Sequence, residues 1–191
     1  MSRGVRKAAV YQDDVDRSEF LRLLGVVIER YRWECYAYCL MTNHFHVVVQ
    51  TIEPTLSRGM QWLNARYAVW FNERYGLEGH AFERRFNSVL IKNQEHFVVA
   101  VQYVVLNPVR AGICGSPGEW RWSSFLATAG VVRPRLCLTV DWLTGHFGGD
   151  QREAARRFVQ CVEGPDASRH VRALTPDVAP WASRRMVRLR R

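Results

Sequence analysis

The chain has 191 residues, the length of one domain with an appendage. Its 48% hydrophobic and 24% charged residues are typical of a globular protein and exclude a disordered or fibrous one. Lys and Arg outnumber Asp and Glu by 27 to 18, and the resulting formal net charge of +9 favours a polyanionic partner, with nucleic acid ahead of a membrane.

The cysteines indicate a reducing compartment, because they are odd in number and contain no C-x-x-C pair that would encode a zinc finger or a disulfide framework. They are Cys35, Cys39, Cys114, Cys137 and Cys161. The first residues lack an apolar signal segment, and no stretch approaches the roughly 18 apolar residues that a transmembrane helix needs. We therefore expect a cytoplasmic protein with no membrane association.

The first part of the chain predicts a helix followed by a strand. Asp16 and Glu19 are spaced as a capping box, and apolar residues then recur at helical spacing as far as Tyr31. From Trp33 to Leu40 the period changes to two, which is typical of a strand with two mostly apolar faces. The alternation places four residues on one face: Trp33, Cys35, Ala37 and Cys39.

A second strand, His44 to Thr51, follows the short polar interruption Thr42-Asn43, so an antiparallel hairpin is expected. A long helical pattern then starts at Pro54-Thr55 and ends around Tyr75-Gly76. Beyond a glycine-bounded loop, residues Phe86 to Ile91 predict a third strand.

Glu95 to Leu106 predicts a further helix, ended by Asn107-Pro108 because a residue before proline is driven away from the α region. Two shorter helical patterns follow, near Val140 to Phe147 and from Gln151 to Val162. The order of elements indicates an α+β fold, an antiparallel sheet flanked by helices. We expect a main domain over 1–128, an accessory helical segment over 129–164 and a mobile basic tail over 165–191.

The stretch HFHVVV contains the first candidate site, because side chains at i and i+2 of a strand share a face. His44 and His46 can therefore converge on one ion, while Phe45 points into the opposite layer. Two imidazoles suit a catalytic ion that keeps open positions for water and substrate, which requires a third protein ligand. H-x-H alone favours the other interpretation, two ordinary hydrogen-bonded histidines, so a metal site needs a further partner.

The second candidate site is Tyr103 with Asn107, which are neighbours on one helix face at i and i+4. A tyrosine nucleophile and a metal-ligating amide can share one site in this arrangement. The alternative is a core aromatic residue beside an asparagine that caps the end of its helix.

Together these segments resemble a known family. HFHVVV is similar to the histidine motif of HUH nucleases, and YVVLNPVRAG, residues 103–112, is similar to the catalytic helix of single-tyrosine HUH transposases. More narrowly, the chain resembles the REP-associated tyrosine transposases, relatives of the transposases of the smallest bacterial insertion sequences. The resemblance covers most of residues 2–125, and its further motifs are SRG at 2–4, LSRGMQ at 56–61, GHAF at 79–82 and WRWSS at 120–124.

The resemblance implies a ferredoxin-like or RRM-like HUH nuclease core with a helical C-terminal extension. It implies a single-strand DNA endonuclease and strand transferase in which Tyr103 attacks a phosphate, leaving a 5′-phosphotyrosine link and a free 3′-hydroxyl. His44, His46 and Asn107 would hold a divalent ion, Mg²⁺ or Mn²⁺. No nucleotide cofactor is expected, because a phosphotyrosyl bond conserves the energy of the phosphodiester and no phosphate-binding G-x-x-x-x-G-K-[ST] motif is present.

Under this interpretation the partner is single-stranded or hairpin DNA, with palindromic repeats as the expected substrate, and the protein is a monomer or a homodimer. Basic residues would then contact phosphates, and Arg85 is the first candidate because it lies in the loop GHAFERRF. The expected DNA contacts are Arg58, Arg84, Arg85 and Arg110.

The family usually carries an extended segment before its Ser-Arg-Gly, and that segment would form a strand of the sheet. Here Met1 stands directly before Ser2. Either the true start lies upstream or the copy is truncated, in which case an unpaired sheet edge is expected. This leaves two other hypotheses: a catalytically inactive nucleic-acid-binding relative, and a metal-dependent hydrolase that uses the histidines with water and forms no covalent intermediate.

Overall fold

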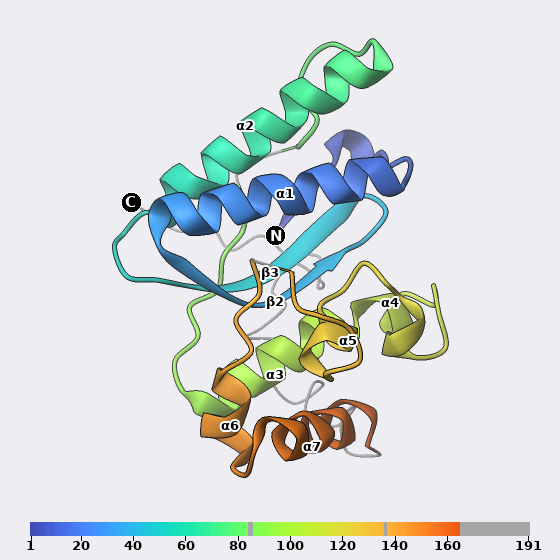
Figure 1. The fold of residues 1–191 in the computed structure, drawn as a ribbon. Coiled ribbons are helices and arrows are strands. Elements are labelled where there is room, and N and C mark those ends of the chain that lie inside the picture. Colours follow the sequence, from blue (N-terminus) through green and yellow to red (C-terminus); the bar gives the residue numbers. More distant parts are fainter. Residues whose placement is uncertain (84–85, 136, 165–191) are drawn as a thin grey trace.

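The computed structural model describes residues 1–83, 86–135 and 137–164 (Figure 1). The chain forms a small antiparallel sheet with helices on both faces, which confirms the α+β prediction. The tail expected over 165–191 lies outside the described residues.

The sheet consists of β1 (Ser2–Arg3), β2 (Trp33–Leu40) and β3 (His44–Thr51) in the order β1-β3-β2. β2 and β3 pair antiparallel along their whole length, which confirms the predicted hairpin. β1 pairs only with the start of β3, through Ser2 opposite Phe45 and Arg3 opposite His44.

A bulge in β2 corrects one prediction. The register shifts between Cys35 and Ala37, so the strand changes the face to which its side chains point. Trp33 and Cys35 pack in one core cluster, whereas Ala37 and Cys39 pack in the other. The strict alternation that predicted one shared face for these four residues was therefore wrong, because an extra residue in a strand reverses everything beyond it.

On one face of the sheet lie α1 (Asp14–Tyr31) and α2 (Leu56–Tyr75), the two long helices in Figure 1. α1 begins two residues before the predicted cap: the Asp13 side chain accepts hydrogen bonds from the backbone nitrogens of Val15 and Asp16. This capping box satisfies amides that the first turn of a helix leaves without a partner.

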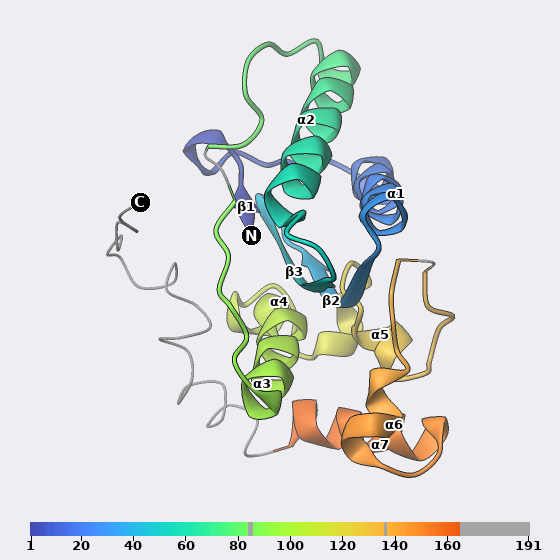
Figure 2. The ribbon, with the colours of Figure 1, turned by 90° about the vertical axis from the view of Figure 1, so that its left-hand side faces the viewer.

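The opposite face is covered by α3 (Gln94–Val105), which ends one residue before the prediction and is followed by the short α4 (Asn107–Arg110). Beside α3 lie α5 (Phe125–Thr128), α6 (Trp142–Phe147) and α7 (Gln151–Glu163) (Figure 2). The two core clusters correspond to these two sides of the sheet. α6 and α7 pack with α3 rather than directly on the sheet, and the Gln102 amide donates to the Cys161 carbonyl at 2.7 Å.

The strand predicted over Phe86 to Ile91 is wrong. The segment is extended but belongs to no strand, and its backbone pairs with the sheet region at one point, where Asn87 and Met1 exchange N–H and carbonyl groups at 2.9 Å. Just before this segment, Gly4 and Phe82 form an isolated antiparallel β-bridge. The backbone N–H of Glu83 donates to the Arg3 carbonyl. β1 thus lies between β3 and this segment, and pairing stops where β1 ends, because a strand needs a neighbour with unpaired backbone groups.

Two short 3₁₀ turns, Val5–Lys7 and Pro117–Glu119, complete the described elements. The backbone at Trp122 to Ser124 runs along the outer edge of β2, where Leu40 N donates to Trp122 O and Ser124 N to Tyr38 O. None of the helices in the described parts of the chain has the length and apolar character that crossing a bilayer requires.

Candidate active site

The two histidines of β3 lie on the sheet face that α3 covers. Phe45 between them packs on the other face, with its ring centroid 4.4 Å from that of Phe20 in α1. The rings of His44 and His46 are 5.0 Å apart, centroid to centroid. The alternation of the strand therefore places both imidazoles together, as the i, i+2 spacing predicts.

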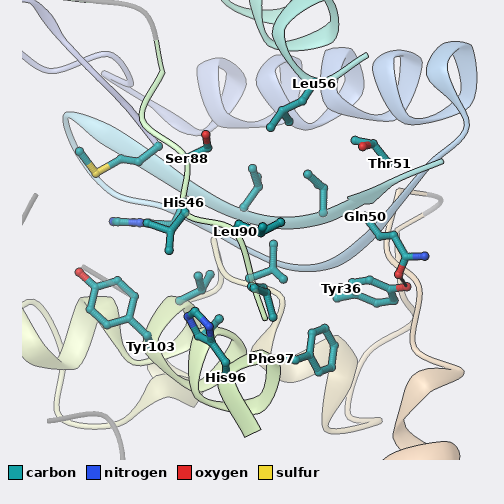
Figure 3. A pocket seen from close by; sticks show the side chains of 18 of the residues that line it. Tyr36, His46, Gln50, Thr51, Leu56, Ser88, Leu90, His96, Phe97 and Tyr103 are labelled. Atoms are coloured by element: carbon teal, nitrogen blue, oxygen red, sulfur yellow. Dashed lines mark hydrogen bonds between the residues drawn. The ribbon is translucent and has the colours of Figure 1, made fainter. Parts of the chain in front are cut away.

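Tyr103 of α3 contacts this pair. Its ring centroid lies 5.7 Å from that of His46, at an interplanar angle of 80°, and both side chains are almost fully buried. Figure 3 shows the two rings facing one another from the strand and the helix. The fold thus joins the two sites that the sequence identified separately.

A hydrogen bond orients His44. Its Nδ1 lies 2.7 Å from the Asn43 Oδ1, and an amide oxygen can only accept, so Nδ1 carries the proton and Nε2 keeps a lone pair. Asn43 is itself fixed by two further hydrogen bonds. Its side-chain Nδ2 donates to the Lys7 carbonyl, and its backbone carbonyl accepts from the Gly4 N–H. A metal-binding imidazole is commonly held in this way through its other nitrogen.

Burial keeps both imidazoles neutral. Desolvation, with smaller effects of Arg3 and the chain amino group, lowers the pKa of His44 to about 4. Desolvation together with the neighbouring His44 lowers the pKa of His46 well below its usual value. Neutral imidazole is the form that binds a metal, so the pair stays competent as ligands throughout the neutral range.

Asn107 begins α4 one turn beyond Tyr103. Its Nδ2 donates to the Tyr103 carbonyl at 2.7 Å, so the amide nitrogen is engaged and the Oδ1 is the atom left to bind an ion. Pro108 is tolerated next to it because the first turn of a helix does not use that N–H. The same hydrogen bond ties the expected ligand to the expected nucleophile.

The predicted DNA contacts are only partly located. Arg110 is exposed, and its Cζ lies 4.9 Å from the centre of the Tyr103 ring. Arg58 is exposed near the start of α2, a helix on the other side of the sheet from α3 (Figure 2), and no contact joins it to the histidines or Tyr103 among the described residues. Arg84 and Arg85 lie outside the described residues.

A cavity of about 670 Å³ extends from His46 and Tyr103 along β3. Its walls are β3, α3 and the extended segment 86–93, together with Leu56 and Met60 of α2, and Figure 3 shows side chains from these elements around it. His96 lies on its α3 wall, where Nδ1 accepts from the Lys92 amide at 3.3 Å. The candidate nucleophile thus lies at the end of an open space large enough for part of a substrate.

The donor set fits an ion that also binds its substrate. The described residues contain no group of three or more His, Cys, Asp or Glu side chains placed to hold a metal. Two neutral imidazoles and an amide oxygen would be an incomplete, uncharged ligand set, which would leave a divalent ion open positions and net charge for a phosphate.

Sequence reasoning missed two residues of the site. Asn43 was expected only as part of a turn, although a polar residue directly before H-x-H is the signal that points to an orienting hydrogen bond. Arg3 also stands near His44, whose pKa it helps to lower. It reaches the site because β1 pairs with the start of β3, and nothing local in the sequence predicts this.

The arrangement of a sheet-borne histidine pair against a helix-borne tyrosine agrees with the class expected from the sequence, the single-tyrosine HUH transposases. The chain belongs to the family of IS200-like transposases, whose family model matches residues 3–107, more than half of the chain. The matched stretch begins in β1 and ends at Asn107, so it contains His44, His46 and Tyr103.

A solved structure of a REP-associated tyrosine transposase bound to a REP hairpin has a similar fold, with a TM-score of 0.57 and 16% sequence identity. The likeness covers 78% of this chain and 84% of that one, and at this identity it shows a shared fold. No curated protein matches the chain.

Proposed function

We propose that the protein is a metal-dependent transposase that cleaves and rejoins single-stranded DNA through a 5′-phosphotyrosine intermediate. The observation that carries the proposal is the contact between His46 and Tyr103, which brings the H-x-H strand to the tyrosine of α3. Membership of the IS200-like transposase family supports DNA transposition as the process.

In the proposed reaction the Tyr103 phenol loses its proton and its oxygen attacks the scissile phosphorus. The bond from phosphorus to the 3′-oxygen breaks, and that oxygen leaves as a 3′-hydroxyl after taking up a proton. Attack by a 3′-hydroxyl on the phosphotyrosine reverses these steps and joins two strands. The bonds formed and broken are equivalent in energy, so no nucleotide cofactor is required.

The residues of the site divide this work. His44 and His46, neutral and held by the sheet, and the Oδ1 of Asn107 would bind the ion, Mg²⁺ or Mn²⁺. When bound, a divalent cation supplies charge neutralisation and an orienting contact for the phosphate, which a phenol with an ordinary pKa of about 10 needs in order to react at neutral pH. The hydrogen bond from the Asn107 side chain to the Tyr103 carbonyl would hold the proposed ligand and the proposed nucleophile at a fixed distance from one another.

We propose hairpin DNA as the substrate. The fold is shared with a transposase that was solved with a REP hairpin. The net charge of +9 supports binding to a polyanion, and most of the affinity of such complexes comes from phosphate contacts. A cytoplasmic location and a monomeric or dimeric state remain predictions from the sequence.

Incubation with a labelled single-stranded hairpin and Mg²⁺ or Mn²⁺ tests the proposal. The wild type should form a covalent protein–DNA adduct that survives denaturation. Tyr103→Phe should abolish it, because the phenolic oxygen becomes part of the new bond. Tyr31→Phe is the matched control, since Tyr31 ends α1 on the far side of the sheet and packs beside Trp33.

The other outcomes identify the alternatives. Cleavage that survives Tyr103→Phe would indicate a hydrolase in which the histidines act with water. Hairpin binding without cleavage in either metal would indicate a nucleic-acid-binding relative without activity. An adduct that forms equally in the presence of EDTA would remove the metal from the proposal.

A further inference from the structure

The side chain of Arg110 lies over the proposed nucleophile. Its Cζ is 4.9 Å from the centroid of the Tyr103 ring, although the two residues belong to different helices. The α3 helix ends at Val105 and α4 begins at Asn107, so Arg110 follows Tyr103 by two turns across this junction. A long arginine on this side can fold back over the aromatic ring.

Arg110 differs from the arginines that have a structural anion. Four arginines of the described chain pair with carboxylates: Arg22, Arg74, Arg121 and Arg157. Within the same described residues no such ion pair involves Arg110, whose side chain is exposed. Its guanidinium is therefore available to an anion that arrives with the substrate.

The position over the ring determines which anion this would be. For in-line attack the phosphorus must lie about 3–3.5 Å from the phenolic oxygen. The two non-bridging oxygens then stand beside the edge of the Tyr103 ring, within reach of a guanidinium above its face. Arginine donates two parallel N–H groups in the geometry that a phosphate accepts.

We propose that Arg110 is a catalytic residue that binds the non-bridging oxygens of the scissile phosphate and stabilises the charge that develops there during attack by Tyr103. The inference rests on the proposed function of the site. This role differs from that of a general contact to the DNA backbone, whose loss weakens DNA binding equally in the ground state and in the transition state. It also differs from a positioning role, in which the cation only holds the ring in place.

Single-turnover cleavage at saturating hairpin DNA separates these roles. Arg110→Ala should lower the rate of adduct formation about 100-fold, as loss of one donor to a developing negative charge does, and change the dissociation constant less than about threefold. Arg110→Lys should recover part of the rate, because it keeps the charge and loses the paired donors. Arg152→Ala, an exposed arginine on α7, is the control and should change neither quantity.

A substrate with a methylphosphonate at the scissile position tests the phosphate contact directly, because one charged oxygen is replaced by a methyl group. The penalty of Arg110→Ala should shrink to less than about threefold on this substrate. An equal penalty on both substrates would overturn the proposal in favour of ring positioning, and an unchanged rate on the natural phosphodiester would overturn it outright. If the wild type forms no adduct, the proposed function fails; if it does and Arg110→Ala matches it, only the role of Arg110 fails.

Discussion

The hydrogen bond between Asn43 and His44 decides which atom of the site faces a ligand. It fixes the proton on Nδ1 and leaves Nε2 basic, while burial lowers the pKa of the ring to about 4. A histidine in this state is a metal ligand that does not compete with protons at neutral pH. Under the proposed function, the small polar turn before β3 would orient a metal ligand in addition to reversing the chain.

Asn43→Ala should weaken Mn²⁺ binding by about 10- to 100-fold, because the imidazole loses the partner that orients it. Titration of Mn²⁺ into the free protein, followed by calorimetry or electron paramagnetic resonance, measures this without reference to activity. Asn72→Ala is the matched control, since that amide donates to the Gly79 carbonyl at the end of α2. Unchanged Mn²⁺ affinity in Asn43→Ala would contradict the orienting role.

His44→Ala and His46→Ala should each reduce cleavage at least about 100-fold while hairpin affinity changes by less than about threefold. Under the proposed function the histidines would act at one phosphate, whereas the affinity for DNA is spread over many phosphate contacts. Adduct formation and fluorescence anisotropy on the same hairpin give the two values. A parallel loss of both would argue against a catalytic role.

At the scale of the element, the bulge in β2 shows where local pattern reasoning stops. The period of two correctly predicts that Trp33 to Leu40 is a strand, and helical spacing correctly predicts α1, α2 and α3. One extra residue near Tyr36 nevertheless moves Ala37 and Cys39 to the α3 face. An alternating apolar sequence fits either register, so packing against the neighbouring layers decides between them.

Gly59 in α2 is a second feature of this kind. A Cβ at this position would stand 2.3 Å from the Cζ2 of Trp33, so the helix packs closely on the strand only because the side chain is absent. Within a helix a glycine normally costs stability relative to alanine. The tertiary contact reverses that expectation here.

Gly59→Ala should therefore destabilise the protein by about 1–3 kcal/mol, the usual cost of overpacking. Gly145→Ala in α6 should instead be neutral or stabilise by up to about 1 kcal/mol, because nothing lies within 4 Å of its Cβ position. Urea unfolding of the two variants measures both. A stabilising Gly59→Ala would show that α2 and Trp33 are not in tight contact in solution.

At the scale of the whole molecule, the described residues pair with β3 along its length on one side and only at its start on the other. Met41 N donates to His44 O on the β2 side, and Gly4 N donates to the O of the preceding Asn43 on the β1 side, so backbone groups point alternately to the two sides from Asn43 onward. β1 pairs with β3 no further than Phe45, and beyond it Val47 and Val49 have no strand partner on that side among the described residues; both line the cavity. The extended segment 86–93 lines the same cavity beside this edge.

Native-state hydrogen exchange of the 191-residue chain should distinguish the two sides of β3. The amides of Val47 and Val49 should exchange at least about tenfold faster than those of His46 and Val48, which face β2. Nuclear magnetic resonance resolves individual amides and provides the comparison within one strand. Equal protection of all four would mean that the open edge is paired in solution.

The sequence by itself determined the features that depend on neighbours along the chain. His44 and His46 share a face because a strand alternates, and Tyr103 and Asn107 are adjacent because a helix turns every 3.6 residues. Composition and these local periods also sufficed for the α+β class and for most elements. The strand expected at Phe86 to Ile91 failed because a strand exists only with a partner, and that partner is distant in sequence.

Only the tertiary structure decided which of these local features meet. The contact of His46 with Tyr103, the approach of Arg3 to His44 and the position of Arg110 over the Tyr103 ring join β3, β1, α3 and α4. These contacts form because both faces of one sheet are buried at once. The hydrophobic free energy that drives this burial is summed over the two cores and is encoded in no single segment. Chain connectivity and periodicity supply the chemical groups, and the packing of the two layers brings them into one site.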